Sequence, residues 1–107
     1  MDTPGFAVNE GKGFTITFPN GITLSTQIGP GNYCENFDML ATAAIPRRME
    51  SRTAELAVWG AKGEWITERM MAALPAELID GRDGDDVVPH APVALWVAAV
   101  AWCAAQD

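Results

Sequence analysis

The sequence predicts an α+β domain: a four-stranded antiparallel sheet, built from two hairpins, with a C-terminal helix packed on one face. Alternating apolar and polar residues on both sides of two short turns predict the hairpins, and each turn ends in glycine. An alanine-rich apolar run at residues 91–105 predicts the helix. The chain has 107 residues, of which 49% are hydrophobic, so it has the size of a single domain that buries its own core.

Residues 1–12 are expected to form a weakly ordered arm, and residues 13–28 the first hairpin. Apolar residues alternate with polar ones on both sides of Pro19-Asn20-Gly21. A two-residue turn at Asn-Gly would place the two apolar sets on opposite faces of the hairpin. A three-residue turn aligns them and puts the glycine in the left-handed position. We therefore predict the three-residue register, with Ile16 opposite Leu24.

Residues 29–36, Gly-Pro-Gly-Asn-Tyr-Cys-Glu-Asn, are predicted to form a rigid, irregular loop, because glycine and proline interrupt a ladder. Asp38 is a candidate cap for a short helix that ends at Pro46. A small basic island follows, whose arginines we expect to pair with Glu50 or Glu55. Its members are Arg47, Arg48 and Arg52.

The second hairpin is predicted over residues 54–69, around the turn Ala61-Lys62-Gly63. Its register pairs Trp59 with Trp65 and continues the second strand to Arg69. Both faces of this hairpin are apolar. The hairpin is therefore expected at the centre of the sheet, or with one face against a partner.

After the second hairpin we predict a helical turn at residues 70–74 that Pro75 stops, followed by an exposed acidic loop at residues 77–86. The loop contains one arginine and five acidic residues: Glu77, Asp80, Asp83, Asp85 and Asp86. Calcium binding is an alternative reading of these carboxylates, but their spacing does not match an EF-hand loop. We expect no metal ion.

The last helix is predicted from Ala91 or Pro92 to Ala105. Leu95 and Trp102 form a small ridge, which either lies under the acidic loop or is a candidate surface for self-association. An opposite stripe is expected to pack on the sheet: Val93, Trp96, Val97, Val100 and Cys103. The apolar run is 15 residues long, shorter than the roughly 20 that a membrane span needs, so no membrane contact is expected.

Charge restricts the classes of partner. Fourteen acidic residues against seven basic ones give a net charge of -7, which disfavours direct binding to DNA or RNA. Such a charge favours a basic protein surface, or it only keeps the chain soluble. The acidic loop is a candidate mimic of nucleic-acid phosphates. Tyr33 is a candidate contact residue, unless its ring packs on the sheet.

No catalytic site or cofactor is expected. Cys34 and His90 are a conceivable nucleophile and base, with Asp38 to orient the imidazole, but no local signature supports the pair. Residues 29–32 are rich in glycine but lack the lysine of a phosphate-binding loop. The two cysteines are expected to be reduced thiols of a cytosolic protein, and residues 1–5 lack the features of a signal peptide.

Residues 13–36 resemble the opening of a family of small uncharacterised bacteriophage and prophage proteins. The shared features are an aromatic strand, an Asn-Gly turn, a polar strand and the signature Gly-Pro-Gly-Asn-Tyr-Cys. Residues 54–59 and Trp65 fit the same pattern. The resemblance implies no enzymatic activity. Because small acidic phage proteins often inhibit bacterial immunity, anti-CRISPR proteins among them, it implies a protein that acts in the cytoplasm of an infected bacterial host.

The leading hypothesis is a phage-encoded inhibitor that binds a bacterial defence protein, namely a CRISPR effector, in a stoichiometric complex. Its acidic residues would block a basic DNA-binding surface. One alternative is a sponge for a signalling nucleotide, with a pocket around residues 29–32 and 47–52. Another is a small phage assembly protein that dimerises through Leu95 and Trp102. The sequence leaves both a monomer and a homodimer open.

Overall fold

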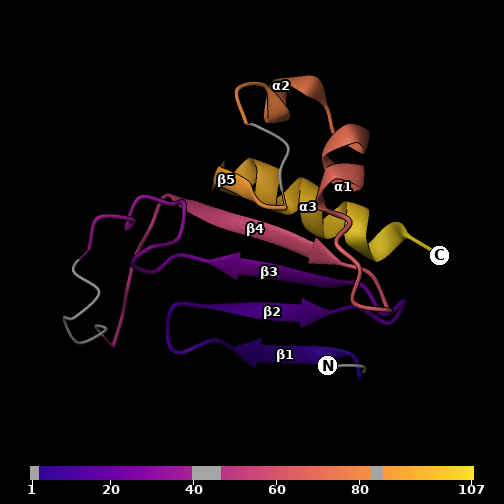
Figure 1. Ribbon diagram of the computed structural model, residues 1–107, viewed down its shortest axis with the longest axis horizontal. Coiled ribbons are helices and arrows are strands. Elements are labelled where there is room, and N and C mark those ends of the chain that lie inside the picture. The colour runs from indigo at the N-terminus through magenta and orange to yellow at the C-terminus, as the bar shows by residue number, and fades with distance from the viewer. Residues whose placement is uncertain (1–2, 40–46, 83–85) are drawn as a thin grey trace.

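The computed structural model describes residues 3–39, 47–82 and 86–107, which form an α+β fold with one antiparallel sheet (Figure 1). The strands are β1 (Gly5–Val8), β2 (Gly13–Thr17), β3 (Thr23–Gln27), β4 (Thr53–Trp59) and β5 (Val88–Pro92). The helices are α1 (Thr67–Ala73), α2 (Ala76–Ile79) and α3 (Val93–Ala105). The predicted class and C-terminal helix are confirmed, but in the described residues the sheet has five strands, in the order β1-β2-β3-β4-β5, rather than four.

The first hairpin has the predicted register, in which Ile16 lies opposite Leu24. Gly21 closes the turn with a φ of 86°, and its N–H donates to the Phe18 carbonyl at 2.8 Å. Asn20 extends the turn across the molecule, because its Nδ2 donates to the carbonyls of Cys103 at 2.7 Å and Gln106 at 2.8 Å. These carbonyls belong to the end of α3, whose last turn has no intrahelical donors for them. One turn residue therefore ties the sheet to the helix.

Part of the expected N-terminal arm is a strand. Residues 5–8 form β1 and pair with β2, with Phe6 opposite Ile16 and Val8 opposite Phe14. The free edge of β2 supplies the ladder partners that a segment of four residues needs. The prediction of a weakly ordered arm is therefore wrong for these residues.

The second hairpin is only partly as predicted. Trp59 and Trp65 form a bridge, and the Ile66 N–H donates to the Val58 carbonyl at 2.9 Å, but Arg69 lies in α1. Thr67 explains the change, because its Oγ1 accepts from the Val58 N–H at 3.0 Å and donates to the Asp86 carbonyl at 2.7 Å. Its side chain thus occupies a ladder donor of β4, and the chain continues as a helix. The helix ends before Pro75, as expected.

The second neighbour of β4 in the sheet is β5, which includes Ala91 and Pro92, the residues expected to start the last helix. Ala54 pairs with Ala91 and Leu56 with Val88, with an irregularity between the two pairs. Proline is tolerated here because β5 is an edge strand and needs no donor on its outer side. The strand thus replaces the predicted second arm of the second hairpin.

Helix α3 packs on the sheet through only part of the predicted stripe: Cys103 is buried and Trp96 and Val100 pack against the core, whereas Val93 and Val97 do not. Its fully buried residues are Leu95, Ala99 and Cys103, whereas Val93 is 69% and Val97 is 55% exposed. Leu95 therefore lies in the core and offers no surface to a second copy. The error has a physical cause, because a helix that is apolar on every side contains no polar residue that marks its outer face.

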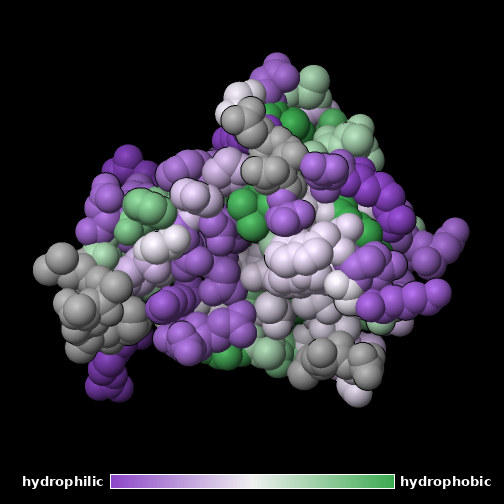
Figure 2. Space-filling model, in the orientation of Figure 1, coloured by the Kyte–Doolittle hydropathy of each residue, from purple (hydrophilic) through white to green (hydrophobic). Residues whose placement is uncertain are grey.

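The two faces of the sheet differ in character. Leu24, Leu56 and Val58 lie on the face that α3 covers and are fully buried. The opposite face carries polar residues of β2 and β3, namely Thr15, Thr17, Thr23, Ser25 and Gln27. Figure 2 shows a surface that is mainly pale to purple over these two strands. In the described ranges, no helix has both the length and the apolar character needed to cross a membrane.

Candidate functional site

The predicted irregular loop is held by side chains that replace a ladder. The Asn32 Oδ1 accepts from the Gly29 N–H at 3.1 Å, and its Nδ2 donates to Glu55 Oε1 at 3.4 Å. The other carboxylate oxygen of Glu55 accepts from the Tyr33 N–H at 3.1 Å. Glu55, on β4, was expected to pair with an arginine, but it binds the loop instead.

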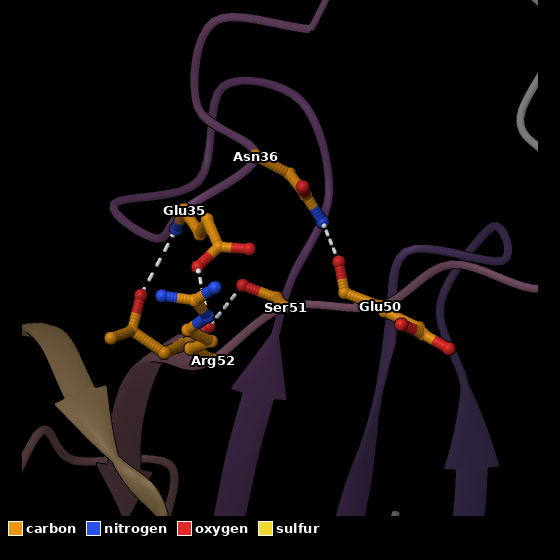
Figure 3. A network of polar contacts seen from close by, with 6 residues as sticks. Glu35, Asn36, Glu50, Ser51 and Arg52 are labelled. Carbon is orange, nitrogen blue, oxygen red and sulfur yellow. Dashed lines mark hydrogen bonds and ion pairs between the residues drawn. The ribbon is translucent and has the colours of Figure 1, made fainter.

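Figure 3 shows how the same loop is attached to residues 50–53. The Asn36 Nδ2 donates to the carbonyls of Glu50 at 2.9 Å and Ile28 at 2.8 Å. The Glu35 N–H donates to Thr53 Oγ1 at 3.0 Å. Because these contacts reach the end of β3 and the start of β4 from one short segment, they fix the orientation of the loop relative to the sheet.

The loop presents two aromatic rings to solvent. Tyr33 is 49% and Phe37 is 43% exposed, and their rings stack with centroids 5.4 Å apart and an interplanar angle of 6°. Tyr33 is therefore exposed and does not pack on the sheet. Sequence reasoning missed Phe37, because no local pattern indicates that its ring stacks on Tyr33. We call these two residues the aromatic pair.

The aromatic pair is connected to the acidic part of the chain through β5. The His90 N–H donates to the Tyr33 carbonyl at 2.8 Å. Arg82 Nη2 in turn donates to the His90 carbonyl at 3.2 Å, and its Nη1 donates to the Leu78 carbonyl at 3.0 Å. The structure thus brings the loop of Tyr33 and the segment after α2 into one region.

Three predicted contact residues are exposed carboxylates on either side of Arg82 in the chain: Glu77 on α2, Asp80 just after it, and Asp86 before β5. We call them the acidic surface. Asp83 and Asp85 were predicted to belong to it but lie outside the described residues.

The acidic surface is not neutralised by the bases that the structure describes. The ion pairs found among the described residues involve Glu10, Glu35 and Glu50, all far from it in the sequence. Arg82 binds carbonyls, and the guanidinium of Arg69 lies over the Trp102 ring, 5.7 Å from its centroid. Among the described residues, the carboxylates of Glu77, Asp80 and Asp86 therefore form no ion pair.

The basic island is divided between two acids. Arg48 pairs with Glu50 at 2.8 Å, as predicted, and Arg52 Nε lies 3.6 Å from Glu35 Oε2 rather than near Glu55. Both arginine side chains are highly exposed, so each pair contributes little to stability. Arg47 is exposed as well.

The cysteines are placed as buried thiols. Cys34 is 1% exposed, and its Sγ donates to the Gly29 carbonyl at 3.7 Å rather than to His90. Burial raises the pKa of Cys103 to about 12, so this thiol stays protonated and is a poor nucleophile. In the part of the chain that the structure describes, no three His, Cys, Asp or Glu side chains gather to hold a metal ion.

Comparison with protein-family models, curated protein sequences and solved structures finds no match for this chain. The resemblance of residues 13–36 to phage proteins therefore stays a prediction.

Proposed function

We propose that this protein acts by stoichiometric binding to a basic protein surface, through the aromatic pair and the acidic surface. One observation carries the proposal: exposed carboxylates without described basic partners flank Arg82, and hydrogen bonds through His90 link Arg82 to the loop that carries two exposed, stacked aromatic rings. Aromatic residues are the usual anchors of protein interfaces, and charges around them set the choice of partner and the association rate.

The loop at residues 29–37 is held in one conformation, which favours binding through the aromatic pair. Tyr33 is held by hydrogen bonds at both its N–H and its carbonyl, to Glu55 and His90. A binding surface that is already ordered loses less conformational entropy when a partner binds. The aromatic pair is thus expected to enter a pocket of the partner without rearrangement of its loop.

The charge of the acidic surface suggests which kind of basic protein surface binds it. A groove that binds nucleic acid is lined with lysine and arginine, and it attracts carboxylates as it attracts phosphates. We therefore propose a partner that binds DNA or RNA and is inhibited when this protein occupies its groove.

The narrower form of the proposal names the partner as a CRISPR effector of an infected bacterial cell, which makes the chain an anti-CRISPR protein of phage origin. Its support is the sequence resemblance of residues 13–36 together with the net charge of -7. The narrower and the broader forms can fail separately, since a different nucleic-acid-binding protein would satisfy only the broader one.

The test is a DNA-binding assay with purified CRISPR effector complexes. The protein should block target DNA at a one-to-one ratio, and the inhibition should fall steeply as salt rises. The triple variant Glu77→Gln/Asp80→Asn/Asp86→Asn should weaken it at least about tenfold, and Tyr33→Ala by about the same factor.

The matched control neutralises three exposed carboxylates elsewhere, Glu10→Gln/Glu50→Gln/Glu68→Gln, and should retain inhibition. Equal inhibition by both triple variants would show that the acidic surface is not the contact. If no effector is inhibited, the narrower proposal is wrong, and affinity capture on immobilised protein at low and high salt then tests the broader one. A partner retained equally at both salt concentrations would contradict that form.

A further inference from the structure

Helix α3 is apolar on its outer side as well as on its core side. Its sequence, VALWVAAVAWCAA, contains no charged residue, serine, threonine, asparagine or glutamine. Leu95, Ala99 and Cys103 face the core, yet Val93 and Val97 remain 69% and 55% exposed. Surface helices carry polar residues on the outer side, and helices that are apolar all round are normally covered on both sides.

The sheet has an uncovered apolar region beside this helix. Phe6 and Val8 on β1 are 78% and 77% exposed, and they pair with the half-buried Ile16 and Phe14 on β2. The ladder continues from Ile16 to Leu24, so these side chains lie on the same face as the core. Figure 1 shows α3 beside β4 and β5, with no helix beside β1 and β2.

A hollow lies between the start of α3 and the sheet, and it adjoins the uncovered strands at Phe14. Its volume is about 290 Å³, and its lining includes Phe14 and Ile28 from the sheet side and Val93 and Trp96 from α3. Trp96 Nε1 donates to Thr26 Oγ1 at 2.9 Å, so the indole needs no further partner. We call this surface the apolar step, and its members are Phe6, Val8, Phe14, Ile16, Val93 and Val97.

We infer that a second copy of this chain covers the apolar step, with α3 of each copy lying on β1 and β2 of the other. A step is complementary to itself under a two-fold rotation, as an isologous dimer requires. A helix is about 10 Å wide, and two strands spaced about 4.8 Å apart give a floor of similar width. The outer side of α3 in one copy would thus be covered by β1 and β2 of the other copy, whose apolar side chains would be buried in turn.

The chemistry of the step favours a second copy over other occupants. Strands β1 and β2 and helix α3 contain no charged residue, and among the residues that line the hollow only Arg52 is charged, so the step offers little to a basic or acidic partner. The exposed apolar area is on the order of 500 Å² per copy, and two copies reach the roughly 1,000 Å² expected of a biological interface.

The inference does not depend on the proposed function. The aromatic pair and the acidic surface share no residue with the apolar step, so a dimer of this kind would leave both available to a partner. Self-association therefore concerns a surface other than the predicted Leu95 ridge.

Sedimentation equilibrium tests the inference directly. The wild type should sediment at twice its chain mass of 11.5 kDa. Val97→Asp and Phe6→Ser should each raise the dimer dissociation constant at least about 100-fold. The matched control, Tyr33→Ser, replaces an exposed aromatic outside the step and should leave the mass unchanged. A monomeric wild type at all concentrations, or a dimer that survives Val97→Asp, would overturn the inference.

Cross-linking then tests the arrangement. A copy carrying Val97→Cys, mixed with a copy carrying Phe6→Cys, should form a disulfide-linked dimer, because the helix of one copy lies on the strand of the other. Pairing of two β1 edges would instead link Phe6→Cys to itself. A product of the latter kind alone would contradict the interlocked dimer. Flotation of a monomeric wild type with vesicles would show that lipid, not a second copy, covers the step.

Discussion

The loop at residues 29–37 and the edge strand β1 both border the sheet, but they are held in different ways. The loop has no regular structure, yet Asn32, Asn36 and Glu55 supply the donors and acceptors that fix it. Strand β1 has regular pairing to β2 but leaves Phe6 and Val8 largely exposed. Regularity and firm attachment are thus separate properties, because side-chain amides and carboxylates can replace a ladder where strands cannot continue.

Of the substitutions that test this comparison, Glu55→Ala is expected to have the largest effect on stability. The substitution leaves the Tyr33 N–H and the Asn32 amide without their charged acceptor, so it should lower the free energy of unfolding by about 2–3 kcal/mol. Urea denaturation measures the change. The control is Glu68→Ala, an exposed carboxylate on α1, which should cost under about 0.5 kcal/mol. Equal costs would mean that Glu55 does not hold the loop.

Asn36→Ala should come next, at about 1–2 kcal/mol, because two carbonyls lose one shared donor. Asn36→Asp keeps the shape but removes the donor, so it should cost at least as much. Hydrogen exchange should also show faster exchange of the Glu35 amide, whose acceptor on Thr53 depends on the same attachment. A stable Asn36→Asp variant would contradict this account of the loop.

Cys103 lies on the core side of α3, outside both the loop and β1, and its ionisation tests how firmly the core is buried. Its pKa rises from 9.0 to about 12 in the folded protein because of burial, so the unfolded chain releases this proton first as the pH rises. Stability should therefore be unaffected below pH 9 and fall between pH 9 and 12, by up to about 1.4 kcal/mol per unit. Cys103→Ala should remove this component of the slope in urea denaturation from pH 8 to 11. An unchanged slope would contradict it.

Phe6→Ser should have the smallest effect on the stability of one copy. The ring is 78% exposed, so in dilute solution we expect a loss of under about 0.5 kcal/mol. Thermal unfolding at decreasing protein concentration would separate this small loss from any effect on self-association. A loss above 2 kcal/mol in the dilute limit would show that β1 is held more firmly than its exposure indicates.

The features that were predictable from the sequence are those that two constraints determine together. In the first hairpin, the glycine of the turn and the need to align two apolar sets allowed one register. The turn at residues 61–63 was equally readable, but the strand after it was not, because Thr67 takes a ladder donor through a side-chain contact that no alternation records. The short alternation at Phe6 and Val8 gave too little pattern to predict β1.

The candidate site was less predictable than the fold. Its acidic residues and Tyr33 could be named from charge and residue type, but the link between the two segments consists of contacts of His90 and Arg82. Such contacts join residues that are distant in sequence and leave no local signal. The buried side of α3 was partly mispredicted because all its sides are apolar, and only the position of the sheet selects one.

Asn20 has a consequence for the order of folding. The strands of the meander pair between neighbours in sequence, whereas the bonds of Asn20 join residues 83 and 86 positions apart. Closing so long a loop costs conformational entropy that the contact offsets only after it has formed. The sheet is therefore expected to form first and α3 to dock last. Asn20→Ala should then accelerate unfolding in stopped-flow kinetics while leaving the refolding rate nearly unchanged. The hydrogen bonds of Asn20 are thus expected to slow unfolding, and with it the loss of the native state, without affecting how fast the fold forms.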